Sequence, residues 1–349
     1  METFLYILLM FVIKIAIVLA IAFTAAASAV FAERKVAAYI QCRIGPNRVG
    51  PKGLLQPFAD VLKLIMKEDI VPYEANKVFH KIGPMITLTV AFAIYAVIPF
   101  GDFFYLNGEK VYLGIATSPN INIGVLFILA MTGLNIYGVT LSGWSSNNKY
   151  SLLGGVRSSA QMVSYEIVMG LALVGVILIT GSFGLTDIVN HQDNWKWNLF
   201  LNPIGFLLYL TASFAETNRT PFDFPECEQE LVNGFNTEYS GMKFGIFYLA
   251  EYINVFTVSL IMSLLYLGGW TLPFPSEWIG LEAGSFWLSL IQLVVLLVKT
   301  SLLVFFFFWV RWTIPRFKYN QLMDLGWKVF LPLGLLNIIL TAIGVYCFK

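Results

Sequence analysis

Charged residues are scarce in this sequence. They make up 12% of its 349 residues, about half of the roughly 25% that soluble domains carry. Hydrophobic residues make up 58%, and the mean hydropathy is +0.73. This composition excludes an ordinary water-soluble domain and predicts a polytopic membrane protein. The formal net charge is only +1, so we expect no nucleic-acid partner.

Cysteine and histidine are also scarce. The three cysteines (Cys42, Cys227 and Cys347) lie far apart without a Cys-x-x-Cys pair, and His80 and His191 each stand alone in expected loops. Neither a disulfide framework nor a zinc or iron–sulfur site can be built from such a set. Glycine-rich nucleotide loops and serine-nucleophile motifs are missing as well. The sequence therefore predicts no metal site and no complete active site within this chain.

Long apolar runs, in contrast, are abundant. A hydrocarbon core of about 30 Å takes about 20 apolar residues of helix, and eight stretches approach that length, the fifth being the shortest. Backbone groups in lipid must pair internally, and barrel-type alternation is missing, so the runs predict helices. We expect an all-α integral membrane protein with eight transmembrane helices in a single membrane domain, 1–349. The expected spans are 4–31, 82–100, 121–143, 160–181, 198–215, 243–269, 284–310 and 328–347.

The distribution of Lys and Arg predicts an orientation. The segments that follow spans 1, 3, 5 and 7, counted with the first residue of the next span, hold 17 of the 22 bases, and cytoplasmic segments are the ones enriched in bases. Both termini are therefore expected on the periplasmic side. The first span has Glu2 and no base before it, so we expect an uncleaved helix and not a signal peptide.

An acidic insert follows the fifth span. Residues 216–243 hold six carboxylates against two bases, and apolar runs flank the insert on both sides. We expect 216–242 to be an acidic cytoplasmic loop. One interpretation is a solvated acidic face; the other is a set of carboxylates at the membrane surface, some of which hold protons. The six are Glu216, Asp223, Glu226, Glu228, Glu230 and Glu238.

A second long polar segment, 32–81, follows the first span and is expected to be a cytoplasmic loop with a surface helix. Its glycines and prolines at 45–51 exclude a helix there. Apolar residues between 58 and 66 then recur at helical spacing, which predicts a short helix along the membrane surface. Its apolar face suits a lipid anchor and the wall of a cytoplasmic cavity equally well.

Two carboxylates lie inside expected spans, Glu166 in the fourth and Glu251 in the sixth. A carboxylate in a bilayer costs about 2.5 kcal/mol or more and usually faces a polar partner or a water path. One such residue is commonly a structural hydrogen-bonding group. Two of them joined by an acidic loop favour a proton relay.

After the seventh span, Arg311, Arg316 and Lys318 suit interfacial anchors, and the two arginines also suit partners of the acidic loop.

Eight short motifs occur along the chain: FAERK (31–35), GPNRVGP (45–51), KEDIVP (67–72), SYE (164–166), AETNRTPFDFPE (215–226), EYSG (238–241), AEY (250–252) and RWTIPRFKYNQLMDLGWK (311–328). Through these motifs, their order and the number of spans between them, almost the whole chain resembles the H subunit of bacterial NADH:quinone oxidoreductase, respiratory complex I, and its mitochondrial counterpart.

The resemblance implies a membrane subunit at the joint between the membrane arm and the peripheral arm. Its cytoplasmic loops would form much of the tunnel that brings ubiquinone or menaquinone to a buried reduction site. The enzyme would be a proton-translocating NADH:quinone oxidoreductase of the bacterial inner membrane, with quinone as substrate and FMN and iron–sulfur clusters in partner subunits. Expected partners are the quinone-site subunits of the peripheral arm, adjoining small membrane subunits and lipid.

The resemblance also assigns residues, by motif. The residues expected to bind quinone or support its path are Glu33, Arg34, Asp60, Lys63, Arg219, Asp223, Arg311 and Arg316. The carboxylates expected to couple quinone reduction to proton movement are Glu166, Glu216, Glu226, Glu228, Glu230, Glu238 and Glu251. Asn320 stands where the family often has aspartate, so no proton-handling role is expected there.

Two alternatives remain open at this point. The corresponding membrane subunit of an energy-converting hydrogenase or formate hydrogenlyase would need no quinone, and the full AETNRTPFDFPE and GPNRVGP motifs favour the quinone enzyme over it. A stand-alone cation transporter with intramembrane carboxylates would act without partners, and the large cytoplasmic loops argue against it.

Overall fold

The computed structural model describes residues 2–106, 109–115, 122–193, 195–225, 228–272 and 284–348. These residues are mostly helical, which confirms the all-α prediction; the described strands are one antiparallel hairpin with Phe103 opposite Tyr112. The elements are α1 (Glu2–Ile40), η1 (Pro51–Gly53), α2 (Gln56–Met66), α3 (Lys77–Ala93), η2 (Ile94–Ala96), β1 (Phe103–Leu106), β2 (Glu109–Tyr112), α4 (Gly124–Ser145), α5 (Lys149–Thr180), α6 (Leu185–His191), α7 (Asn198–Leu201), α8 (Pro203–Glu216), α9 (Glu228–Leu231), η3 (Gly234–Asn236), α10 (Gly241–Tyr266), α11 (Phe286–Thr313), α12 (Tyr319–Asp324), the π-helical η5 (Leu325–Phe330) and α13 (Leu331–Phe348).

Seven helices within the described residues are long and apolar enough to cross a membrane. The fifth expected span, 198–215, is instead divided into α7 and α8 at Asn202. The Asn202 side chain accepts a hydrogen bond from the backbone nitrogen of Gly205 at 2.9 Å and so caps a new helix that starts at Pro203. The 14 residues of α8 reach only about 21 Å. The expected count of eight is therefore not established.

The first helix is longer than its apolar run. The sequence predicted a loop from residue 32, but α1 continues to Ile40. Ala37 and Ala38 are almost fully buried and extend the packed face of the helix beyond the polar Glu33 and Arg34. The acid and the base that were expected in a loop are therefore held on a rigid helix.

The two histidines, expected in loops, both lie on helices. His80 is fully buried in the first turns of α3, which begins at Lys77, and His191 is the last residue of α6. The side chain of Asn76 caps α3 by accepting hydrogen bonds from the next turn, so the helix begins before its apolar run does. A short helix, α2, forms where one was predicted and contacts α1 and α10; its position along the membrane surface stays a prediction.

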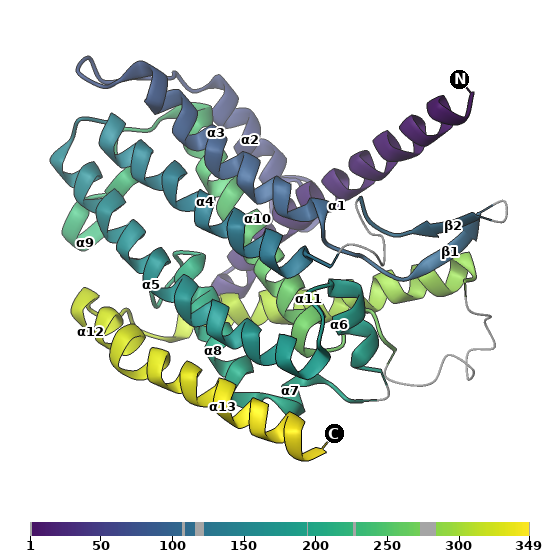
Figure 1. Ribbon diagram of the computed structural model, residues 1–349. Helices are drawn as coiled ribbons and strands as arrows, with labels where there is room; N and C mark the ends of the chain where they lie inside the picture. The colour runs from purple at the N-terminus through teal and green to yellow at the C-terminus, as the bar shows by residue number, and fades with distance from the viewer. Residues whose placement is uncertain are drawn as a thin grey trace.

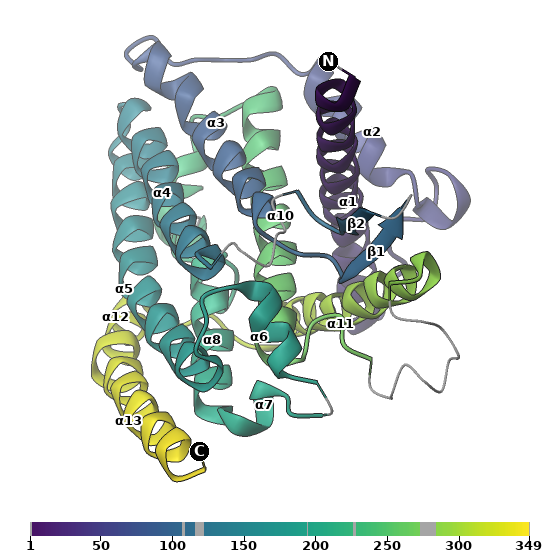
Figure 2. The ribbon, with the colours of Figure 1, turned by 45° about the vertical axis from the view of Figure 1, so that its right-hand side comes forward.

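The described helices form a bundle around α5 and α10. Figure 2 shows α3, α4, α5 and α10 side by side, and α13 and α8 pack against α5. In Figure 1, α1 and α11 cross this bundle obliquely, and both contact α10. The helices α3 and α4 approach closely because Gly138 has no side chain; a β-carbon there would meet the backbone nitrogen of Thr87 at 3.1 Å.

Lys299 fixes the end of α10. It lies within the expected seventh span, where an unpaired ammonium would be costly. Its Nζ donates hydrogen bonds to the backbone carbonyls of Leu267, Gly269 and Thr271 at 2.8, 2.9 and 3.0 Å, which follow the last turn of α10. These carbonyls belong to the C-cap residue and the turn that follow α10, so Lys299 holds that turn against α11. The contact fixes the end of the helix that carries Glu251.

Candidate functional site

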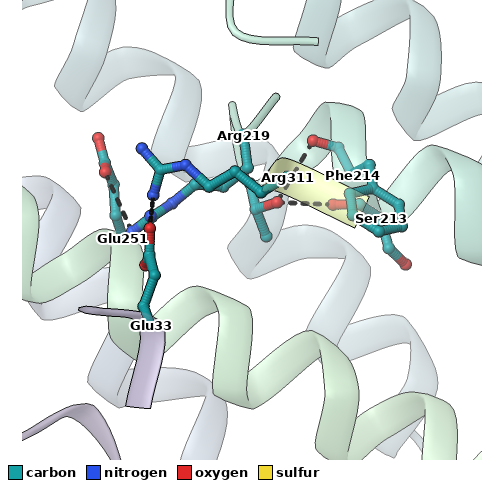
Figure 3. Close-up of polar contacts among 7 residues, drawn as sticks. Glu33, Ser213, Phe214, Arg219, Glu251 and Arg311 are labelled. Carbon is teal, nitrogen blue, oxygen red and sulfur yellow. Dashed lines mark hydrogen bonds and ion pairs between the residues drawn. The ribbon is translucent and has the colours of Figure 1, made fainter. Parts of the chain in front are cut away.

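Four charged side chains meet where α1, α10 and α11 converge (Figure 3). Arg219, in the loop after α8, donates a hydrogen bond from Nη1 to Glu33 Oε2 at 3.1 Å. Its Nη2 lies 3.6 Å from Glu251 Oε2. Arg311 of α11 donates to the other carboxylate oxygen of Glu33. Arg219 therefore contacts one carboxylate on each of two helices.

The centre of this cluster, Glu33 and Arg219, is buried, whereas Glu251 and Arg311 are partly exposed, and the four charges balance. Only 4% of Glu33 and 5% of Arg219 is exposed. Two arginines face two glutamates, so none of the four is left as a lone buried charge. The Arg219 guanidinium also lies over the ring of Tyr252, 4.3 Å from its centroid. Removing one partner from such a buried network typically costs about 3–5 kcal/mol, because it leaves the other charge uncompensated.

The end of α8 aims Arg219 into the cluster. Asn218 adopts a left-handed backbone conformation, φ 50°, which ends the helix. The backbone nitrogen of Arg219 then donates back to the carbonyl of Phe214 at 3.4 Å. Phe214 itself stacks on Phe307 of α11 with ring centroids 4.1 Å apart. The turn is thus anchored to the helix that also carries Arg311.

Four of the other expected quinone-site residues form two ion pairs of their own. Arg316 pairs with Asp223 at 2.6 Å, and Arg34 pairs with Asp60 at 2.7 Å. The first pair is mostly buried, whereas the second is partly exposed to solvent and contributes less to stability. Lys63 is exposed on α2.

Two of the expected proton-coupling carboxylates lie near each other inside the bundle. Glu216 is the last residue of α8 and is 6% exposed. Its carboxylate makes no hydrogen bond or ion pair with the described residues, and it interacts electrostatically with Glu166 of α5. The carboxylate of Glu166 lies against Gly133 of α4. A β-carbon at position 133 would come within 3.0 Å of Glu166 Oε1. Glu251 is separate, because it contacts Arg219.

The remaining carboxylates lie towards the start of α5. Glu230 accepts a hydrogen bond from Arg157 at 2.6 Å, and Glu238 accepts one from Asn148 at 2.6 Å. Glu226 and the side chain of Glu228 lie outside the described residues. The structure therefore does not bring all the expected carboxylates into one group.

Two small cavities lie beside Glu216. Each has about 20 Å³ of free volume, and Asn135, Glu216 and Asn254 line both. Glu251 lines the second cavity. Neither asparagine was predicted from the sequence; an amide inside the apolar third and sixth spans was the only available signal.

Tyr239, which precedes α10, anchors the end of the acidic loop. Its ring stacks on buried His80 with centroids 4.1 Å apart, so the segment that carries Glu238 is held against α3. Burial raises the pKa of Tyr239, and hydrogen bonds with Ser142, Ser145 and Ser146 offset part of the rise. The tyrosine therefore stays neutral at physiological pH.

Comparisons with known proteins give a consistent result. The family described as NADH dehydrogenase matches residues 13–342. The chain is 53% identical to NADH-quinone oxidoreductase subunit 8 of Rhodothermus marinus, over 92% of each chain. It is 52% identical to the H subunit of NADH-quinone oxidoreductase from Salinibacter ruber, over 91% of each. It is 45% identical to the corresponding H subunit of Flavobacterium johnsoniae, over 94% of this chain and 93% of the relative.

Proposed function

The chain belongs to the NADH dehydrogenase family as a membrane subunit of NADH-quinone oxidoreductase, and from this premise we propose that it guides quinone to its reduction site and links that reduction to proton movement. One observation carries the proposal: Arg219 contacts both Glu33, expected at the quinone path, and Glu251, expected in the carboxylate chain. Family membership favours this role over the hydrogenase and transporter alternatives.

The link between the two roles is electrostatic. Reduction gives the quinone head negative charge, which protons from nearby groups neutralise. Two unit charges about 4 Å apart interact by about 4 kcal/mol at an effective dielectric constant of 20. A change of charge near Glu33 therefore changes the strength of the ion pair between Arg219 and Glu251, whose atoms are 3.6 Å apart. Glu251 then gains or loses a proton, and Glu216 and Glu166 respond in turn.

The outer pairs would form the polar part of the quinone path. Arg316 with Asp223 and Arg34 with Asp60 supply charges near the cluster, with Lys63 further out. The quinone tail needs apolar walls. The exposed apolar side chains of α2 suit this need, which supports the cavity-wall interpretation of that helix. They are Phe58, Leu62, Ile65 and Met66.

Other parts of the assembly would supply what this chain lacks. FMN and iron–sulfur clusters would lie in partner subunits of the peripheral arm, which would dock on the cytoplasmic side near 32–81 and 216–242. The remaining carboxylates at this side, Glu226, Glu228, Glu230 and Glu238, would continue the coupling chain. Both termini would face the periplasm, as the distribution of bases predicts.

Asp223→Asn is expected to lower NADH:quinone reductase activity about tenfold in the assembled enzyme. The substitution keeps the shape of the side chain but leaves Arg316 without its carboxylate, a loss of about 1.4 kcal/mol or more for a charged hydrogen bond. The measurement is quinone reduction in membranes. Reduction of a soluble acceptor that takes electrons before the quinone should stay unchanged.

Asp324→Asn is the matched control. Its carboxylate pairs with Lys328 one helical turn away at 2.7 Å, and both side chains are exposed. Exposed pairs of this kind contribute little, so activity should stay within twofold of the wild type. Unchanged quinone reduction in Asp223→Asn, in a fully assembled enzyme, would count against a role for Asp223 in the quinone path.

A further inference from the structure

Asn135 of α4 is a buried amide whose side-chain oxygen has no protein partner. Only 7% of the residue is exposed, and its Oδ1 has no hydrogen-bond partner among the described residues. An unpaired polar atom in a buried site costs about 1–3 kcal/mol. An apolar side chain would be more stable in the interior of a membrane bundle. The buried amide oxygen is therefore explained best by a hydrogen-bond donor that comes from outside the protein.

The cavities beside Asn135 have the size and polarity for water. A bound water needs about 10–15 Å³ of free volume and two to four polar partners, and each cavity offers about 20 Å³. Besides Asn135, both cavities are lined by Glu216 and by Asn254 of α10. Thr87 lines the second cavity; its hydroxyl donates to the carbonyl of Pro84 at 2.8 Å, and its oxygen can still accept.

The second cavity is the one that two carboxylates share, Glu216 and Glu251. Glu216 lines both, whereas Glu251 lines the second and contacts Arg219 on its other side. A proton that passes from one carboxylate to the other therefore has to cross this space. Protons move along hydrogen-bonded groups, so an ordered water here completes a path that the side chains leave open.

We propose that Asn135 is a positioning residue that binds a water molecule between Glu216 and Glu251. The amide oxygen accepts a hydrogen bond from the water, and Asn254 provides a second contact. The water then takes a proton from the Glu216 carboxyl group and gives another to the Glu251 carboxylate, so the water is regenerated and one proton has moved. The relay rests on the proposed function, whereas the water site stands on the cavity and the unpaired amide.

The test uses the whole enzyme, with the substitutions Asn135→Leu, Asn135→Ser and Asn337→Leu. Leucine fills the space of the amide without an acceptor, and serine restores one oxygen. Asn337 of α13 is the matched control, since it is 2% exposed and has an unpaired Nδ2 but lines neither cavity. Asn135→Val, a smaller apolar replacement, carries the test if Asn135→Leu does not assemble.

Two readouts are needed. The first is the infrared difference spectrum between oxidised and reduced enzyme, in which a bound water gives an O–H stretching band that shifts in water labelled with oxygen-18. We expect this band in the wild type and in Asn337→Leu, and its loss in Asn135→Leu. The second is the number of protons pumped per NADH in proteoliposomes, expected to fall at least twofold in Asn135→Leu and to recover in Asn135→Ser.

The outcomes separate this inference from the proposed function. An unchanged water band and pumping ratio in Asn135→Leu would overturn the water site, even if Glu216→Gln stops pumping as expected. Equal losses in Asn135→Leu and Asn337→Leu would reduce Asn135 to a structural amide. If Glu216→Gln pumps normally, the proposed function fails, and the water band still decides whether Asn135 binds water.

Discussion

Arg219→Met is expected to lower NADH:quinone reductase activity at least about 100-fold in the assembled enzyme. The substitution removes the guanidinium that lies against Glu33 and Glu251, so Glu33 keeps only Arg311 of its two arginines and the contact between Glu33 and Glu251 through Arg219 is broken. Breaking a buried charge network of this kind typically costs about 3–5 kcal/mol of stability. The 100-fold loss of rate corresponds to an activation barrier for quinone reduction that is about 2.7 kcal/mol higher. Quinone reduction by isolated membranes is the measurement, normalised to the amount of intact complex.

Two further variants sharpen this result. Arg219→Lys keeps the charge but cannot reach both carboxylates with one planar group, so an intermediate loss is expected. Lys328→Met removes a cation from an exposed pair with Asp324 and should change activity less than twofold. Wild-type activity in an assembled Arg219→Met enzyme would show that the buried cluster has no part in quinone reduction.

Glu216→Gln is expected to reduce the protons pumped per NADH to less than about a tenth of the wild-type value. Glutamine has nearly the same shape and suits the buried position, where the carboxylate makes no hydrogen bond or ion pair with the described residues. It cannot release or take up a proton, so the path between Glu166 and Glu251 is cut. The quenching of a pH-sensitive dye in proteoliposomes, with NADH oxidation recorded in parallel, measures the ratio.

Glu74→Gln is the control for this substitution. Glu74 is exposed before α3 and accepts a hydrogen bond from Asn147 at 3.2 Å, away from both cavities. Its pumping ratio should match that of the wild type. A normal ratio in Glu216→Gln would remove Glu216 from the proton path.

Most of the helices were predictable from the sequence. Backbone polar groups in lipid must pair with one another, so a long apolar run can form little else than a helix. Tertiary packing decided the exceptions. Buried alanines extend α1 past Glu33, which hydropathy marks as the start of a loop. Asn202 and Pro203 divide the fifth span, although its residues are as apolar as the others. The hydropathy of a segment indicates whether it is buried, but it does not indicate which other segments it packs against.

The sequence predicted which residues belong to the site, but it did not predict which of them contact one another. Sequence motifs assigned Glu33 and Arg219 to quinone and Glu251 to protons as separate groups, and the structure brings the three together from distant parts of the chain. No spacing in the sequence indicates that contact, because helix packing creates it. Asn135 was missed for the same reason, since its meaning comes from the cavity beside it.

The central claim is that Arg219 joins a quinone side to a proton side. Asp223→Asn and Glu251→Gln, measured together in proteoliposomes, test it most directly, because each removes a carboxylate from one side only. The account predicts that Asp223→Asn slows quinone reduction but keeps the protons pumped per NADH, whereas Glu251→Gln keeps at least half of the quinone reduction and loses at least half of that ratio. Equal, mild effects of both substitutions on both activities would contradict it.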